Sequence, residues 1–262
     1  MADNEGPPRV SVVIPVHNER TVLPTLYQRL VAALETEAAY ELLFVDDGSA
    51  DGSTDWLRDL ARRDRAVTVV VLTRRWGQLA ATLCGLARAR GRELVTLDAD
   101  LAHPPEAVLL LLGALRAGHD VVVGVRERSG RSFPRARASQ ALLRWVFGVR
   151  VPKDLSTFRA FTAEFARRLP KAGEGVVLLG AEICRLGADI GYVPVAVAQR
   201  QHGRSKYAPG RKFLVALAAA ATYGALPWRV LLSPLAEWLG RAAGSSFEVR
   251  EVISTAGGHT GG

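Results

Sequence analysis

Two aspartates one residue apart, Asp98 and Asp100, directly follow an apolar run over residues 93–97. Such a run is typical of a buried strand, and carboxylates at the carboxyl end of a parallel strand lie where open α/β sheets bind ligands. Two carboxylates without a neighbouring cysteine or histidine cluster suit Mg²⁺ or Mn²⁺, which usually also contacts a substrate phosphate. The same residues also fit a polar turn in which Asp98 caps the next helix.

Further acidic residues follow two other predicted strands. Glu19 comes after the apolar run 9–16, and Asp46 and Asp47 come after the run 41–45. Because the carboxyl ends of parallel strands meet at one edge of a sheet, these side chains should converge with the aspartate pair. They can hydrogen-bond the base and ribose of a nucleotide while a metal ion bridges its diphosphate. For Asp47, which a Gly-Ser pair follows, a turn and helix cap is the alternative interpretation.

The elements that must position these residues alternate along the chain up to about residue 126. Apolar runs predict strands over 9–16, 41–45, 67–72, 93–97 and 120–125. The spacing of apolar residues predicts helices over 21–37, from about 54, over 77–89, and from the Pro104-Pro105 pair, because proline suits the first helical turn. Strands that alternate with helices in this way form a mostly parallel sheet with helices on both faces.

Loops that cradle phosphates in other nucleotide enzymes are missing from the sequence. No Gly-x-Gly-x-x-Gly pattern follows the first strand, and no Gly-Lys-Ser/Thr loop occurs. Their absence disfavours Rossmann dehydrogenases and P-loop enzymes. A nucleotidylyltransferase, which has a similar sheet, would want a glycine-rich basic loop after the first strand, and that loop is missing too.

The composition supports one α/β domain with a sizeable core, because 48% of the 262 residues are hydrophobic. The formal net charge is +8, and nearly all of the 34 basic residues are arginines. Guanidinium groups suit phosphates, so the charge fits a nucleotide, an anionic lipid surface or nucleic acid. The arginines are scattered and form no basic stripe with interleaved aromatics, which argues against nucleic acid as a partner.

Four parts can be distinguished along the chain. We expect a disordered N-terminus over 1–8, a catalytic α/β domain over 9–208, amphipathic helices over 209–241, and a flexible tail rich in Gly, Ser and Thr over 242–262. The N-terminus has no apolar signal region, and the apolar stretch 213–228 is shorter than the roughly 20 residues of a membrane span. Cys84 and Cys184 fit buried thiols in a reducing compartment. We therefore predict a cytoplasmic protein, with peripheral contact to the cytoplasmic membrane face as an open alternative.

An ordered set of motifs carries a resemblance to a known family. The leading motifs are Val12-Val13-Ile14-Pro15-Val16-His17-Asn18-Glu19, Val45-Asp46-Asp47-Gly48-Ser49, and Asp98-Ala99-Asp100 with Pro104-Pro105-Glu106. The supporting segments are Arg74-Arg75-Trp76-Gly77-Gln78, Val123-Gly124-Val125-Arg126, Asp154-Leu155-Ser156-Thr157-Phe158-Arg159, and Arg200-Gln201-His202-Gly203-Arg204-Ser205-Lys206-Tyr207. In this order and spacing, over residues 9–235, they resemble the family 2 glycosyltransferases. More narrowly, they resemble the polyprenyl-phosphate sugar transferases of the dolichol-phosphate mannose synthase group.

The resemblance implies a GT-A fold, which is a mostly parallel Rossmann-like sheet with a C-terminal helical extension, and it implies a set of site residues. Those expected to line the nucleotide and its phosphates are Pro15, His17, Asn18, Glu19, Asp46, Asp47, Gly77, Gln78, Arg200, Arg204, Ser205 and Lys206. Asp98 and Asp100 would hold Mg²⁺ or Mn²⁺, and Arg126 would face phosphates. The segment 203–207 would close over the donor, or else form an exposed basic turn.

The resemblance also implies the reaction, in which a hexose moves with inversion from GDP-mannose or UDP-glucose to a polyprenyl phosphate. The alternative is a soluble acceptor that bears a phosphate or hydroxyl group. A hydroxyl acceptor needs a general base, for which Asp154 is the candidate, although Asp154 and Arg159 also fit an ion pair at a helix start. A non-catalytic nucleotide-sugar binder would be expected to lack Asp98 or Asp100, and both are present.

Position 102 is one of the places where the chain departs from the family pattern; His17 is another, because the family often has a tyrosine or a small residue there. The family usually has a glutamine two residues after the second metal-site aspartate, where it can help bind the metal, and this chain has Ala102 there. This departure bears on the metal geometry and on the metal dependence itself, and whether Ala102 changes metal use stays open at this point.

Overall fold

The computed structural model describes residues 7–37, 39–126, 156–171, 178–196 and 248–255, and the single positions 141, 144, 148, 176, 222 and 223. Its strands are β1 (Val10–Val16), β2 (Tyr40–Asp46), β3 (Val67–Leu72), β4 (Glu93–Thr96), β5 (Val121–Arg126), β6 (Arg159–Thr162), β7 (Ile190–Val195) and β8 (Val249–Ser254). Its helices are α1 (Leu23–Leu34), α2 (Ser53–Arg63), α3 (Gln78–Leu86), the 3-10 turn η1 (Pro105–Ala107), α4 (Val108–Arg116), α6 (Ala163–Ala166) and α7 (Leu179–Arg185).

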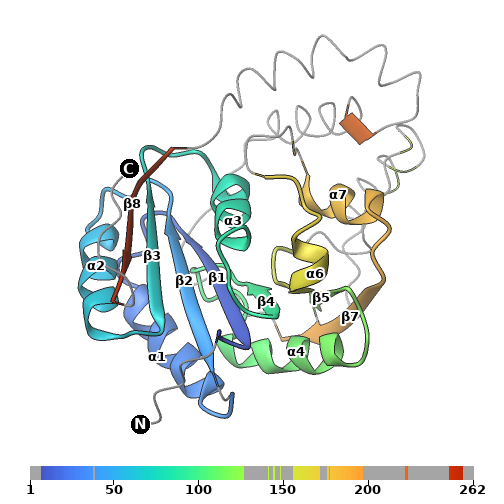
Figure 1. The fold of residues 1–262 in the computed structure, drawn as a ribbon, viewed down its shortest axis with the longest axis horizontal. Helices are drawn as coiled ribbons and strands as arrows, with labels where there is room; N and C mark the ends of the chain where they lie inside the picture. Colours follow the sequence, from blue (N-terminus) through green and yellow to red (C-terminus); the bar gives the residue numbers. More distant parts are fainter. Residues whose placement is uncertain are drawn as a thin grey trace.

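The described strands form one sheet of eight in the order β7-β5-β6-β4-β1-β2-β3-β8 (Figure 1). β1 lies parallel to both β2 and β4, β2 lies parallel to β3, and β5 lies parallel to β7. β6 is antiparallel to both of its neighbours, β4 and β5, so those two strands run in the same direction. The mostly parallel sheet predicted from the alternating pattern is therefore confirmed, with antiparallel additions at β6 and β8.

Residues 249–254, which were predicted to belong to a flexible tail over 242–262, instead form the strand β8. Residues 249–254 pair antiparallel with β3 from Thr68 opposite Ser254 to Leu72 opposite Val249. Nε and Nη2 of Arg58 both donate to the same oxygen, Glu251 Oε2, at 3.1 and 2.8 Å, and this contact joins β8 to α2. The Gly- and Ser-rich flanks pointed to disorder. Within this short stretch, however, Ile253 packs in one buried cluster and Val249 and Val252 pack against the other, so the stretch can cover the edge of β3.

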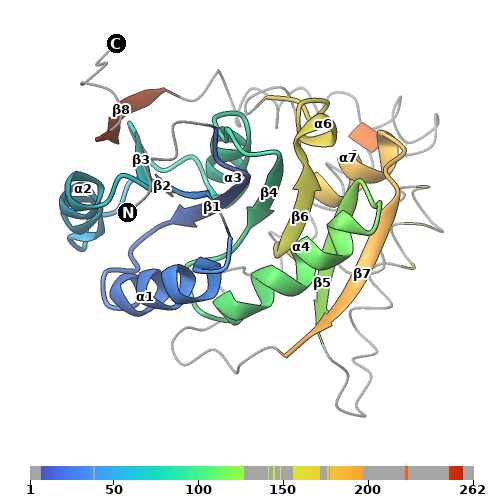
Figure 2. The same cartoon turned by 60° about the horizontal axis from the view of Figure 1, so that its bottom comes forward.

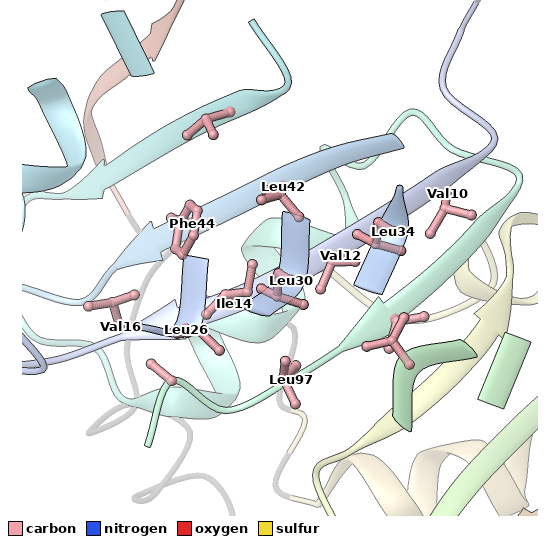
Figure 3. Packing of buried hydrophobic residues seen from close by; sticks show 14 of the residues in the cluster. Val10, Val12, Ile14, Val16, Leu26, Leu30, Leu34, Leu42, Phe44 and Leu97 are labelled. Atoms are coloured by element: carbon pink, nitrogen blue, oxygen red, sulfur yellow. The ribbon is translucent and has the colours of Figure 1, made fainter. Parts of the chain in front are cut away.

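Helices cover both faces of the sheet, as the buried side chains show. One buried cluster joins the sheet to α1, α2 and α4, and the other joins it to α3, α6 and α7 (Figure 2). The two-residue period of β1 sends alternate residues to opposite faces, so Ile14 packs in the first cluster and Val13 in the second. Along α1, leucines at helical spacing pack against β1 and β2 (Figure 3).

None of the helices within the described ranges has the length and apolar character to cross a membrane. The stretch 209–241, predicted to form amphipathic helices, lies outside those ranges except for positions 222 and 223.

Candidate active site

The carboxyl ends of β1, β2, β3 and β4 lie along one edge of the sheet, because these four strands are parallel neighbours. The segments that follow them supply 17–19 after β1, Asp47 after β2, 73–77 after β3, and Asp98 with Asp100 after β4. Hydrogen bonds connect these segments to one another. The structure thus brings the predicted strand-end residues to one edge, where loops from different strands can surround a ligand.

The loop after β1 is held against the loop after β2. Asn18 has a positive φ of 57°, and its Oδ1 accepts the backbone N–H of Ala50 at 2.8 Å. His17 Nδ1 lies 2.8 Å from the backbone oxygen of Asp47. A carbonyl oxygen only accepts, so this contact assigns the proton to Nδ1. Both side chains therefore position the two loops in addition to their predicted role toward a nucleotide.

Asp46 and Asp47 point to opposite faces of the sheet. Asp46 is 1% exposed, and its Oδ2 accepts the hydroxyl hydrogen bond of Thr54 at 2.7 Å on the α2 side. The Asp47 carboxylate accepts the backbone N–H of Trp76 at 2.6 Å and of Gly77 at 2.9 Å, at the start of α3. Asp46 is thus buried on the α2 side, and its other oxygen, Oδ1, has no hydrogen-bond partner among the described residues. Its role in lining a nucleotide stays a prediction.

Asp47 is a buried carboxylate, with 3% of the residue exposed. Burial raises the pKa of this carboxyl above its usual value, and the N–H donors of Trp76 and Gly77 offset part of that rise. The cap of α2 is Gly52 with no side-chain hydrogen bond, so the alternative in which Asp47 caps the following helix is wrong. Asp47 holds the segment before α3, where Gly77 takes a φ of 98°.

Pro15 on β1 and Glu19 in the loop after it are the remaining predicted residues in this part of the chain. Pro15 is buried within the strand, opposite Val45 of β2. The backbone N–H of Glu19 donates to Ser53 Oγ at 3.1 Å, and its carbonyl accepts from Val22 at 2.9 Å in the turn before α1. The residue is half-buried.

Asp98 is held by two donors from distant parts of the chain. Its Oδ1 accepts from Gln78 Nε2 at 2.5 Å, and its Oδ2 accepts from Thr157 Oγ1 at 2.6 Å. The cap of η1 is Pro104 and the cap of α4 is Ala107, neither with a side-chain hydrogen bond. The alternative in which Asp98 caps the next helix is therefore wrong.

Asp100 closes its own turn. Its Oδ1 accepts the backbone N–H of Ala102 at 3.0 Å, and Leu101 between them has a positive φ of 55°. Ala102 is buried and contributes only its backbone to this turn. The polar turn predicted for this segment therefore exists, and it is built on Asp100.

The donor set suits a hard divalent cation. Among the described residues, no three His, Cys, Asp or Glu side chains gather as a metal cluster. Two carboxylates alone suit Mg²⁺ or Mn²⁺, because such an ion takes its other ligands from substrate phosphates and water. Asp98 and Asp100 are both half-buried at the sheet edge, so a phosphate can approach them, and the residues present fit the predicted metal.

Arg126 ends β5 and is exposed at the same edge, beside Val195 of the parallel β7. Several predicted residues lie outside the described ranges, namely Asp154, Arg200, Arg204, Ser205 and Lys206, with the segment 203–207. Arg159, the suggested ion-pair partner of Asp154, is described and is 3% exposed within β6.

Sequence reasoning missed the role of Thr157. Its segment was among the supporting motifs, but nothing in the sequence separates this hydroxyl from that of Ser156. The signal is structural, because β6 inserts between β4 and β5 and brings the residues before it to the end of β4.

Comparisons with known proteins place the chain among relatives of one family. The family model described as "Glycosyl transferase family 2" matches residues 11–169. The undecaprenyl-phosphate 4-deoxy-4-formamido-L-arabinose transferase of Pseudomonas aeruginosa (strain LESB58) is 37% identical over 208 residues, 77% of this chain and 61% of that protein. The transferase of the same name from Edwardsiella ictaluri is 36% identical over 207 residues, 76% of this chain and 62% of that protein. The chain thus spans about three fifths of the length of these curated relatives.

Solved structures give the same fold. A glucosyl-3-phosphoglycerate synthase from Mycobacterium tuberculosis, in complex with phosphoglyceric acid, has a TM-score of 0.60 at 28% identity and covers 86% of this chain and 79% of its own. The same enzyme was solved with Mn²⁺ and UDP-glucose. A mannosyltransferase from Pyrobaculum calidifontis, solved with GDP-Man and Mn²⁺, has a TM-score of 0.57 at 21% identity over 91% of this chain and 84% of its own, a likeness of fold alone. The predicted GT-A fold is confirmed.

Proposed function

This chain belongs to glycosyl transferase family 2, and we propose that it transfers a sugar from a nucleotide-diphospho-sugar to a phosphate-bearing acceptor. The observation that carries the proposal is the aspartate pair, Asp98 and Asp100, at the end of β4. These carboxylates share one sheet edge with the loops after β1, β2 and β3. The edge therefore offers an anchor for a cation beside a surface for the nucleotide.

A polyprenyl phosphate is the acceptor that we propose first. The curated relatives at 36 and 37% identity are named as undecaprenyl-phosphate sugar transferases. For the donor, we propose UDP-glucose as the first compound to test and GDP-mannose as the second, because the 28%-identical solved relative was determined with UDP-glucose.

The chemistry follows from the charges that must be stabilised. An oxygen of the acceptor phosphate forms a bond to the anomeric carbon while the bond from that carbon to the donor diphosphate breaks, which inverts the configuration. A phosphate acceptor is already an anion, so the step needs no strong general base. Bound Mg²⁺ or Mn²⁺ supplies charge neutralisation at the leaving diphosphate.

The chain's own residues would bind and orient the reactants. Asp98 and Asp100 would hold the cation, and the exposed guanidinium of Arg126 at the end of β5 would add positive charge at the same edge. The loops held together by His17, Asn18 and Asp47 would form the wall against which the nucleotide lies.

A soluble phosphate acceptor is a second candidate. A specific observation favours it, because the solved relative that covers 86% of this chain was determined with phosphoglyceric acid. Both acceptors carry a phosphate group, but phosphoglyceric acid also carries a free hydroxyl. Transfer to that hydroxyl would need a general base, and Asp154 is the candidate.

The proposal is tested with the purified full chain. We expect UDP or GDP to raise the melting temperature, and to raise it more with Mn²⁺, because a ligand that binds the folded state stabilises it. Sugar transfer is then measured by mass spectrometry, with undecaprenyl phosphate in detergent and 3-phosphoglycerate as separate acceptors. Product on only one acceptor decides between the two candidates.

Substitution of the metal site provides the control. Asp98→Ala and Asp100→Ala should each lower turnover by about 100-fold or more, because the leaving diphosphate loses its stabilisation. Their far-ultraviolet circular dichroism should match that of the unsubstituted chain. Full activity in either variant contradicts the assignment of the metal site.

A further inference from the structure

We infer that Gln78 and Thr157 are positioning residues that fix the carboxylate of Asp98 for cation binding. The inference rests on the proposed function, because it takes Asp98 as a ligand of the divalent cation. It adds two residues that would not touch the cation themselves, and it gives Asp47 a role in the same arrangement.

The two side chains donate hydrogen bonds to different oxygens of the Asp98 carboxylate. Gln78 Nε2 lies 2.5 Å from Asp98 Oδ1, and Thr157 Oγ1 lies 2.6 Å from Asp98 Oδ2. One hydrogen bond to each oxygen fixes the plane of the carboxylate. A carboxylate offers about four lone-pair positions, and these two bonds use one on each oxygen.

Each donor is itself anchored by its backbone. The two residues before Gln78 donate their N–H groups to the Asp47 carboxylate, at 2.6 and 2.9 Å, and the carbonyl of Gln78 accepts from Thr82 Oγ1 at 2.8 Å. The carbonyl of Thr157 accepts from Thr96 Oγ1 at 2.7 Å. Asp47 on β2 therefore positions Gln78, and Thr96 on β4 positions Thr157.

The result is a row of hydrogen bonds that crosses the sheet edge from the end of β2 to the end of β4 and on to the residues before β6. Asp100 differs from Asp98, because its Oδ1 accepts from the backbone of its own turn. The orientation of Asp98 thus depends on side chains from distant elements. Ala102 lacks a side-chain oxygen for the cation, so the affinity depends more strongly on how well the two aspartates are held.

Removal of either donor should weaken cation binding although neither donor contacts the cation. Groups that hydrogen-bond a metal ligand typically change metal affinity by about 10- to 100-fold when they are substituted. We therefore expect the dissociation constant for Mn²⁺ to rise by about 10-fold or more in Gln78→Ala and in Thr157→Val. Thr157→Ser keeps the hydroxyl and should stay within about threefold of the unsubstituted chain.

The experiment titrates the purified full chain with Mn²⁺ and follows the free ion by electron paramagnetic resonance, without and with UDP. Gln28→Ala is the matched control, because Gln28 is an exposed glutamine on α1, away from the sheet edge. Melting temperatures without metal confirm folding. Gln78 and Thr157 are both exposed, so their substitution should leave that temperature unchanged, and if one variant fails to fold the other carries the test.

The outcomes separate this inference from the proposed function. If the unsubstituted chain binds Mn²⁺, Asp98→Ala abolishes binding, and Gln78→Ala and Thr157→Val bind as tightly as Gln28→Ala, the inference is overturned and the proposed metal site stands. If the unsubstituted chain binds no Mn²⁺ with or without UDP, both are overturned. Weaker binding in Gln78→Ala and Thr157→Val, restored in Thr157→Ser, supports the inference.

Discussion

Gly85 lies where α3 packs closely on the sheet, and replacing it with alanine should destabilise the fold. A Cβ at this position would lie 2.3 Å from Val13 Cγ1 and 3.1 Å from Val45 Cγ2. Carbon atoms that are not bonded prefer about 3.5–4.0 Å, so the first contact falls more than an ångström short. Val13 is fully buried on β1, and its β-branched side chain has one strongly preferred rotamer. Either α3 must shift or Val13 must leave its rotamer.

Gly113 on α4 provides a matched comparison. A Cβ there would meet nothing within 4 Å, so Gly113→Ala should gain only the helix propensity of alanine, about 1 kcal/mol in the free energy of unfolding. Gly85→Ala gains the same propensity, and it also incurs the cost of overpacking, which is typically about 1–3 kcal/mol. The two variants should therefore differ by about 1–3 kcal/mol, with Gly85→Ala the less stable.

Urea unfolding followed by tryptophan fluorescence measures this difference, since the midpoint and slope together give the free energy of unfolding. The slopes of the two variants should agree. If Gly85→Ala unfolds at the same midpoint as Gly113→Ala or at a higher one, the close contact between α3 and β1 is refuted.

Two further predictions concern buried and paired carboxylates. Glu41 is 3% exposed, and its carboxylate accepts hydrogen bonds from the backbone N–H and from Nε of Arg90 at 2.7 and 2.8 Å. Glu41→Gln should therefore lower the free energy of unfolding by about 1.5–3 kcal/mol. An unchanged urea midpoint would contradict this. For Glu93, burial raises the pKa, but the Arg116 and Arg9 guanidinium groups outweigh it and hold the pKa below its usual value. This stabilisation is present above the unfolded-state pKa and is lost as pH falls, so between about pH 5 and pH 3 the chain should lose more stability than Glu93→Gln; parallel pH curves would count against the pairing.

Much of the sheet could be predicted because its signals are local. The apolar runs of β1 to β5 and the leucine spacing of α1 lie within single windows of sequence, and their observed bounds fall within a few residues of the predicted ones. β6 has only four residues and β8 only six. Both depend on antiparallel partners far away in the chain, which a local pattern does not reveal.

The sequence predicted where the candidate site lies, but it did not predict which hydrogen bonds hold its side chains. The strand ends predicted which residues share an edge, and the structure agrees for Asp47, Asp98 and Asp100. The destination of each hydrogen bond depends on how distant elements pack, as with Thr157 and Asp98. The two-residue period of a strand could have predicted that Asp46 and Asp47 face opposite sides of the sheet, because neighbouring strand residues do so.

The pairing of β8 with β3 has a consequence for how the protein is made. The ribosome makes β3 (Val67–Leu72) well before β8 (Val249–Ser254), so the outer edge of β3 stays unpaired in the nascent chain while the residues between them are made. An open edge of this kind recruits strands from other chains, and slow pairing of distant strands prolongs the exposure. Arg58 on α2 lies at that edge and can donate to Glu251 only after β8 has been made. A chain truncated before residue 249 would lack β8, so the edge of β3 would stay unpaired and could promote aggregation.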